Sequence, residues 1–341
     1  MPGCSSTLFE EGHVGYVDLG KFLHGTESER LAEAAATERI CSQGNGFFFV
    51  RNHGVPQELI DRMYDVARKF HSLPQHLKLG IAANGALRGY TPPLGESASK
   101  FGDEHGPKQT ASPGDLVEMF SMGHHVPSRE HDVHYAPNRW LPEEHCPDFR
   151  STCEEYFKHQ TLLMKNILRL LAVALGLQEA FFLDAGRIGE YHSSVFRTHL
   201  YYSLAGQPVQ ANQVRRGSHK DATMLTLLHE NNQVGGLEVL DQHTKEWKAV
   251  IRPADCFVVN IGDTLNRWTN SRWMSQFHRV TNPPQGDSSD RISLITFCFP
   301  DVDTIITPIP GCITTSNPCR WKPIKFQEWF DARYSALNSE T

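Results

Sequence analysis

Two histidines and one aspartate in the second half of the chain are the residues best suited to bind a metal ion. His219 and Asp221 stand in the segment His-Lys-Asp, and residues two apart on an extended strand point to the same side. An imidazole and a carboxylate placed in this way can bind one metal ion, although a surface turn explains such a pair equally well. His278 lies in a later segment that has the composition of a strand. The three side chains together form a candidate metal site.

Two histidines and one carboxylate leave coordination positions open on the metal, which is the arrangement that non-haem Fe(II) oxygenases use. Arg291 and Ser293 open the next predicted strand after a polar loop. A guanidinium can bind a carboxylate through two charge-assisted hydrogen bonds, and a nearby hydroxyl can add another. Each of these residues alone has an ordinary structural explanation. Their order within one run of short strands indicates a metal site next to a carboxylate-binding site.

The composition of the 341-residue chain is that of an ordinary globular protein, with 39% hydrophobic and 21% charged residues. The formal net charge of -6 leaves no basic excess, so a nucleic-acid partner is not expected. The longest apolar stretch, 162–177, is interrupted by Lys165 and Arg169, so a membrane span is not expected. No secretory signal and no Cys-x-x-Cys pair is visible, which favours a cytoplasmic location.

The first half of the chain is predicted to be mainly helical. The predicted strands are 15–23 and 46–52, and the predicted helices are 28–43, 57–70 and 151–175. Ser28 is the expected N-cap of the first helix, and Gly176 is the expected stop after the last. Residues 97–113 are polar and rich in turn-forming residues, which predicts a loop.

After residue 186 the chain consists of short β-rich runs separated by turn residues. The predicted strands are 194–203, 224–229, 237–240, 247–250, 256–260, 277–282 and 292–299, with a turn at 260–263. Runs at this spacing are typical of a β-sandwich or barrel. We therefore predict an α+β protein, mainly β, with a jelly-roll (double-stranded β-helix) core flanked by N-terminal helices and one long helix. Residues 1–150 would form the N-terminal region, and residues 151–335 the long helix and the jelly roll.

Several segments of the chain match motifs of one known family. They are VDL at 17–19, GFFFVRNHGV at 46–55, FHSLP at 70–74, RGY at 88–90, EMFSMG at 118–123, NRWLP at 138–142, GGLEV at 235–239, VNIGD at 259–263, WTN at 268–270 and HRV at 278–280. With the metal-site residues, they make the sequence resemble the 2-oxoglutarate/Fe(II)-dependent dioxygenases of the isopenicillin N synthase-like type. The resemblance covers roughly residues 15–335 and points to fungal-type enzymes that act on small molecules.

The resemblance implies a role for each residue of the candidate site. His219, Asp221 and His278 would bind Fe(II), while Arg291 and Ser293 would bind the far carboxylate of 2-oxoglutarate. Tyr202 stands where many members have a tyrosine that contacts this cosubstrate; the chain reads LYYS where members often read NYYP, so Tyr201 is the alternative. The implied reaction uses O2, converts 2-oxoglutarate to succinate and CO2, and oxidises a C–H bond, most simply to an alcohol. Ascorbate would stimulate it by keeping the iron as Fe(II).

The substrate is expected to be a small organic molecule of nucleobase or secondary metabolism, bound at the mouth of the jelly roll. The residues expected to line its pocket are Phe120, Arg197, His199, Leu225, Trp273 and Phe299. Arg197 is the most informative of them, because a buried cation needs an anionic or carbonyl partner. The sequence does not specify the oligomeric state.

Two other functions are compatible with the same residues. An oxidase of the isopenicillin N synthase type has the same metal ligands but uses no 2-oxoglutarate, so succinate release separates it from the main hypothesis. A non-enzymatic jelly roll that binds metal as a scaffold is the third hypothesis, and the intact His-Asp-His set argues against it.

Overall fold

The computed structural model describes residues 14–338, apart from 85–86, 101–113, 190, 211, 232–234 and 285–286. The strands are β1 Gly15–Asp18, β2 Phe47–Arg51, β3 Gly89–Thr91, β4 Glu118–Gly123, β5 Val195–Tyr201, β6 Arg216–His219, β7 Leu225–Glu230, β8 Leu237–Leu240, β9 Trp247–Ala249, β10 Phe257–Ile261, β11 His278–Val280, β12 Arg291–Cys298, β13 Ile305–Ile306 and β14 Ile324–Lys325. The α-helices are α1 Leu19–His24, α2 Glu27–Gln43, α3 Gln57–Ser72, α4 Gln75–Leu79, α5 Phe149–Ala174, α6 Phe181–Ala185, α7 Asp263–Trp268 and α8 Phe326–Asn338.

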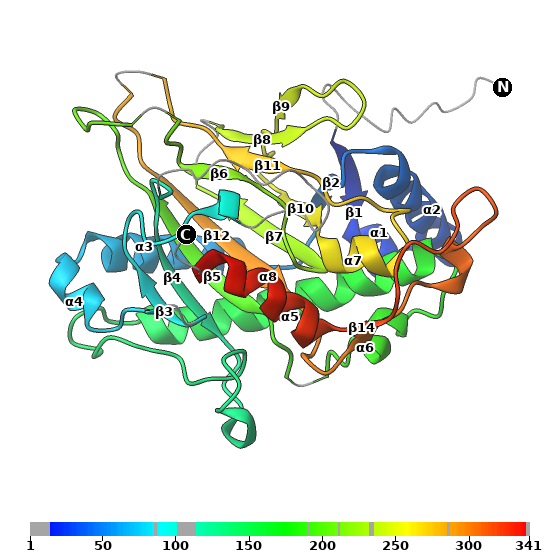
Figure 1. The fold of residues 1–341 in the computed structure, drawn as a ribbon, viewed down its shortest axis with the longest axis horizontal. Helices are drawn as coiled ribbons and strands as arrows, with labels where there is room; N and C mark the ends of the chain where they lie inside the picture. The colour runs from blue at the N-terminus through cyan, green and yellow to red at the C-terminus, as the bar shows by residue number, and fades with distance from the viewer. Residues whose placement is uncertain are drawn as a thin grey trace.

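Two sheets face each other and form the centre of the molecule (Figure 1). In the described part of the chain, the larger sheet has eight strands in the order β1-β2-β10-β7-β12-β5-β4-β3, and the smaller has four in the order β6-β11-β8-β9. An apolar cluster between them joins Leu228 and Ile295 of the larger sheet to Val239 and Val280 of the smaller one. The prediction of an α+β protein with a jelly-roll core is confirmed.

Alternation along the strands separates two environments. On β12, Ile292 and Leu294 belong to the apolar cluster on the helical side, whereas Ser293 and Ile295 face the space between the sheets. Successive side chains of a strand point to opposite faces. One side of the larger sheet therefore packs under helices, while the other side is available to build a site.

Helices α3 and α5 cover the outer face of the larger sheet and contact β12 (Figure 1). The buried stripe of α5 includes Phe157, Met164, Leu168 and Leu171, as its spacing predicts. Gly176 follows this helix with φ +70°, a backbone conformation that glycine adopts without a steric penalty. None of the described helices combines the length and apolar character that a membrane crossing requires.

The structure differs from the predicted elements near the N-terminus. The strand predicted at 15–23 ends at Asp18, whose carboxylate accepts a hydrogen bond from the Lys21 amide and caps α1. The N-cap of α2 is Thr26 rather than Ser28, because Thr26 and Glu29 form a reciprocal capping box.

The helical description of the first half is also incomplete, because β1 to β4 all join the larger sheet. Of the loop predicted at 97–113, a 3-10 turn occupies Ala98–Lys100, and 101–113 lie outside the described residues.

A buried polar cluster holds β4 against α3 and α4. The Glu118 carboxylate accepts hydrogen bonds from Lys78 Nζ at 2.8 Å and from the Tyr90 hydroxyl at 2.7 Å, and lies 2.6 Å from His71 Nδ1. Burial alone would raise the pKa of Glu118, but the hydrogen bond and charge of His71, followed by the hydrogen bonds of Lys78 and Tyr90, lower it to about 2. The cluster therefore contains an ionised carboxylate and an ammonium with almost no access to water.

We expect Glu118→Gln to lower the free energy of unfolding by about 3 kcal/mol, because it leaves the Lys78 ammonium buried without a counter-charge. Glu155→Gln is the matched control, since Glu155 pairs with Arg62 at the exposed surface and should cost less than about 1 kcal/mol. Urea unfolding followed by circular dichroism measures both values. Equal effects of the two substitutions would contradict this account.

Candidate active site

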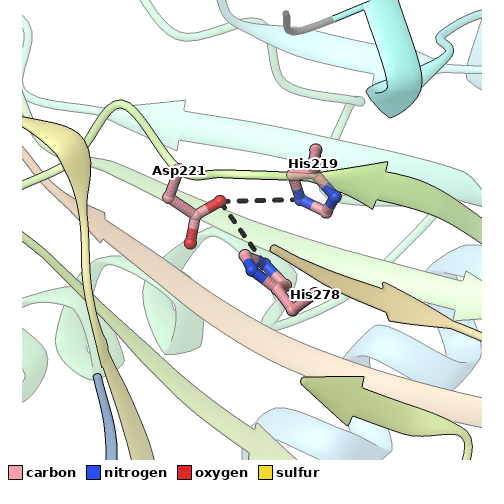
Figure 2. Close-up of side chains that lie close together, drawn as sticks. All are labelled: His219, Asp221 and His278. Carbon is pink, nitrogen blue, oxygen red and sulfur yellow. Dashed lines mark ion pairs between the residues drawn. The ribbon is translucent and has the colours of Figure 1, made fainter. Parts of the chain in front are cut away.

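His219, Asp221 and His278 converge at one end of the smaller sheet (Figure 2). His219 ends β6 and His278 begins β11, and the two are direct partners across this antiparallel pair. Their ring centroids are 4.3 Å apart. Asp221 Oδ1 lies 3.5 Å from His219 Nε2 and 3.7 Å from His278 Nε2. Three buried donor atoms within 4.8 Å of one another can share a single metal ion.

Backbone hydrogen bonds orient both imidazoles. His219 Nδ1 lies 2.8 Å from the Gly217 carbonyl oxygen, and His278 Nδ1 lies 3.2 Å from the Gln276 carbonyl oxygen. A carbonyl can only accept, so each Nδ1 carries the proton and each Nε2 presents a lone pair to the centre of the triad. Burial, and then the charge of His278, lowers the pKa of His219 to about 3. The ring is therefore neutral at physiological pH, as a metal ligand must be.

The Asp221 carboxylate is fixed by two further side chains. Its Oδ2 accepts hydrogen bonds from Thr226 Oγ1 at 2.6 Å and from Asn260 Nδ2 at 2.8 Å. These bonds leave Oδ1 directed at the two histidines.

The turn predicted at 260–263 is wrong, because Asn260 belongs to the buried strand β10 and Asp263 begins α7.

A cavity of about 480 Å³, here called the Arg291 cavity, extends from the triad between the two sheets. Strand pairing places Arg291 beside Tyr201 and Ser293 beside His199, and all four side chains line the cavity. The buried Ser293 Oγ and Arg291 Nε have no hydrogen-bond partner among the described residues. A buried donor of this kind can be satisfied by a water molecule or a ligand, and a guanidinium beside a hydroxyl suits a carboxylate. The cavity therefore fits a small carboxylic acid that reaches the metal site.

The Arg291 guanidinium is paired with a second buried charged group, the Glu230 carboxylate. Its Nη2 donates to Glu230 Oε2, and its Nη1 lies 3.3 Å from the Gly235 carbonyl oxygen. The side chains of Arg291 and Glu230 are each 1% exposed, and the guanidinium lies 5.3 Å from the centre of the Tyr201 ring. These contacts restrict the guanidinium to one orientation.

A second cavity of about 500 Å³, here called the Arg197 cavity, adjoins the triad on its other side. Both cavities include His219, Asp221, Arg216 and Phe297 in their walls. The other residues lining the Arg197 cavity are Leu87, Glu96, Val195, Arg197, Lys220, Ala222, Thr223, Phe299, Phe330 and Tyr334. A molecule in each cavity would meet the other at the metal site.

Two protein-family models match the chain. The N-terminal model of the non-haem dioxygenase in morphine synthesis matches residues 14–143, and the 2OG-Fe(II) oxygenase superfamily model matches residues 193–300. Azadirone synthase LFS of Melia azedarach is 30% identical over 317 residues, covering 91% of each chain. The 2-oxoglutarate-dependent dioxygenase frbA of Dothideomycetidae sp. (strain 11243) is 30% identical over 329 residues, covering 92% of this chain and 94% of that protein.

The chain belongs to the 2OG-Fe(II) oxygenase superfamily. Neurospora crassa T7H in complex with alpha-KG has a similar structure, with a TM-score of 0.80 and 26% identity over 96% of this chain and 98% of that one. The T7H complex with alpha-KG and thymine gives a TM-score of 0.81, with 26% identity and 99% of that chain covered. The oxygenase is thus a 2-oxoglutarate-dependent dioxygenase that uses Fe(II), as the sequence predicts.

The substrate-pocket prediction is wrong for three residues of the oxygenase. Phe120 on β4 and Leu225 on β7 point to the helical side of the larger sheet, because their inward neighbours Met119 and Thr226 occupy the alternate positions. Trp273 is fully buried in the same helical-side cluster. By contrast, Arg197 and Phe299 line the Arg197 cavity, while His199 lines the Arg291 cavity.

Tyr202 does not line the Arg291 cavity, so its predicted contact with the cosubstrate is wrong. β5 ends at Tyr201, which faces inward opposite Arg291. Tyr202 follows at the alternate position, where burial and then the charge of Glu118 raise the pKa of its hydroxyl. Glu118 lies on the helical side of the larger sheet, so Tyr202 points to that side as well. Tyr201, the alternative residue, is the tyrosine beside Arg291.

Other residues of the site were absent from the sequence prediction. Thr226 and Glu230 share a face of β7 because they are an even number of residues apart, but the segment LTLLHE does not alternate between polar and apolar residues, so it gave no signal of this face. Phe330 and Tyr334 reach the Arg197 cavity from α8, and Glu96 reaches it from a loop. Their proximity depends on tertiary packing, which the local pattern does not encode.

Thr226→Val should weaken binding of Fe(II) or Co(II) by about 10- to 100-fold, because it removes a hydrogen bond that orients Asp221. Thr296→Val is the matched control: Thr296 is a buried residue of the adjacent strand β12 whose hydroxyl has no partner among the described residues. Anaerobic calorimetric titration with Co(II) measures the affinity. Equal affinities of the two variants would mean that the hydroxyl does not orient the ligand.

Proposed function

We propose that His219, Asp221 and His278 hold the Fe(II), and that Arg291 and Ser293 bind the far carboxylate of 2-oxoglutarate. The observation that carries this proposal is the Arg291 cavity, whose walls include both the triad and the unpartnered Ser293 Oγ and Arg291 Nε. When bound, Fe(II) and 2-oxoglutarate supply the oxidising chemistry: O2 is consumed, 2-oxoglutarate becomes succinate and CO2, and a C–H bond is oxidised.

The protein contributes orientation and exclusion of water. Glu230 and Tyr201 hold the Arg291 guanidinium in place, so a dicarboxylate that binds there is directed along the cavity toward the triad. The three metal-binding side chains are all buried, which protects the reaction from solvent. His219 and Asp221 also line the Arg197 cavity, so a substrate there lies beside the metal without being one of its ligands.

We propose that the substrate is a small organic metabolite and that the usual product is an alcohol. The Arg197 cavity has largely apolar walls, as small-molecule sites usually do. Fungal dioxygenases such as htyE and frbA, among the relatives of the chain, are consistent with a role in secondary metabolism.

The acidic net charge argues against a nucleic-acid substrate. The described cysteines are all free thiols, which is consistent with a cytoplasmic location.

The direct test is anaerobic loading with Fe(II), followed by addition of O2, 2-oxoglutarate and a panel of candidate metabolites. We expect succinate to form in step with O2 consumption, and Asp221→Ala to abolish it while the folded state persists. Substrate oxidation without succinate would favour the isopenicillin N synthase-type oxidase. No O2 consumption with any metabolite would favour the scaffold.

Arg291→Ala should raise the KM for 2-oxoglutarate at least about tenfold, because it removes charge-assisted hydrogen bonds to the far carboxylate. Ser293→Ala should raise it less, because one hydroxyl donor is lost. Arg279→Ala is the control, since Arg279 lies on β11 and pairs with Glu238 outside both cavities. Steady-state succinate formation gives the constants, and an unchanged KM in Arg291→Ala would make the cosubstrate assignment wrong.

A further inference from the structure

His199 and Tyr201 form a hydrogen-bonded pair on the cavity face of β5. His199 Nδ1 lies 3.2 Å from the Tyr201 hydroxyl oxygen, and both side chains line the Arg291 cavity. Strand pairing places Tyr201 opposite Arg291 and His199 opposite Ser293. The Tyr201 ring lies beside the Arg291 guanidinium, and its hydroxyl reaches back to His199. The hydroxyl therefore lies near Ser293, in the part of the cavity that would bind the far carboxylate of 2-oxoglutarate.

Both members of the pair are uncharged near neutral pH. Burial, and then the charges of Arg216 and Arg197, hold the pKa of His199 well below its usual value. Burial likewise raises the pKa of the Tyr201 hydroxyl. A neutral imidazole carries one N–H and one lone pair. The position of a single hydrogen on His199 therefore decides the direction of the hydrogen bond.

The hydrogens of the pair can be arranged in two ways. In the first, the Tyr201 hydroxyl donates to His199 Nδ1, and the proton of the ring is on Nε2. In the second, His199 Nδ1 donates to the hydroxyl oxygen, and Nε2 keeps the lone pair. A hydroxyl has one hydrogen, so only the second arrangement lets Tyr201 donate to a ligand.

A bound carboxylate favours the second arrangement, because carboxylate oxygens only accept hydrogen bonds. Two bonds then form in series, from His199 to Tyr201 and from Tyr201 to the carboxylate, whereas the first arrangement forms one. The environment of His199 Nε2 agrees, since this atom is buried and has no hydrogen-bond partner among the described residues. Buried N–H groups without a partner are rarer in proteins than buried acceptors without one. The lone pair is therefore expected on Nε2.

We propose that His199 is a positioning residue for the cosubstrate: by donating from Nδ1 to the Tyr201 hydroxyl, it directs the Tyr201 O–H at the far carboxylate of 2-oxoglutarate. The hydroxyl thereby adds a donor to those of Arg291 and Ser293. No proton is transferred, because only the tautomer of His199 is fixed. This inference rests on the proposed function, since it takes the Arg291 cavity as the cosubstrate site.

Isothermal titration of the Mn(II)-loaded protein with 2-oxoglutarate measures the affinity without turnover. Tyr201→Phe should weaken binding about tenfold, because a hydrogen bond to a charged group is lost. His199→Leu should weaken it about fivefold, because the hydroxyl is then neither oriented nor polarised by a donor. The double variant should bind no more weakly than Tyr201→Phe alone, since His199 acts through the hydroxyl.

Two further variants separate this role from a purely structural one. His199→Asn should bind within about twofold of the wild-type protein, because its amide N–H can replace Nδ1–H as the donor. His229→Leu is the matched control: His229 Nδ1 also lies close to a tyrosine hydroxyl, at 2.6 Å from that of Tyr64, but this pair lies outside both cavities. It should leave the affinity unchanged.

Nitrogen NMR of the histidine side chains measures the tautomer directly in the wild-type protein loaded with Zn(II) and 2-oxoglutarate. The signal that disappears in His199→Asn belongs to His199, and it should show the proton on Nδ1. A proton on Nε2 would overturn the proposal. This measurement remains decisive if His199→Leu does not fold.

Unchanged affinity in His199→Leu would also overturn the proposal, as would additive losses in the double variant or a failure of His199→Asn to restore binding. A wild-type protein that does not bind 2-oxoglutarate, or that binds it equally well after Arg291→Ala, would instead refute the proposed function itself.

Discussion

The register of β6 against β11 is the constraint on which the site depends. It sets His219 opposite His278, so that one antiparallel pair delivers both imidazoles to the same point. The carbonyl oxygens of Gly217 and Gln276 then fix the rings by accepting from Nδ1. A shift of one residue would send one imidazole to the other face of the sheet. The short pair therefore needs the apolar packing between the sheets to keep it in register.

Matched buried charges are the second organising feature. Arg291 is paired with Glu230 in one cavity, and Arg197 and Arg216 are paired with Glu96 and Asp115 in the other. An isolated buried arginine would be very costly, whereas a paired one can remain charged in a dry site. The pairing also orients each guanidinium before a ligand arrives. Both binding sites are thus preorganised by carboxylates that need not touch the ligand.

The sequence specified the type of most elements and the residues of the triad, because these depend on local periodicity and on a recognisable motif. The strand predicted at 237–240 is observed with those bounds. The faces of strands were harder to predict: Phe120 and Leu225 were assigned to the pocket but point to the helices. Period-two alternation fixes which residues share a face, but only tertiary packing decides which face is the site. For the same reason, the sequence did not predict that Glu96 contacts Arg197: Glu96 lies on a loop far away in the sequence, and tertiary packing brings it there.

The most direct measurement is an anaerobic crystal structure with Fe(II) and 2-oxoglutarate, with diffraction data collected on both sides of the iron absorption edge. The account predicts one anomalous peak in contact with His219 Nε2, Asp221 Oδ1 and His278 Nε2, with the far carboxylate of 2-oxoglutarate on Arg291 and Ser293. An iron peak elsewhere, or a cosubstrate carboxylate bound away from Arg291, would contradict it.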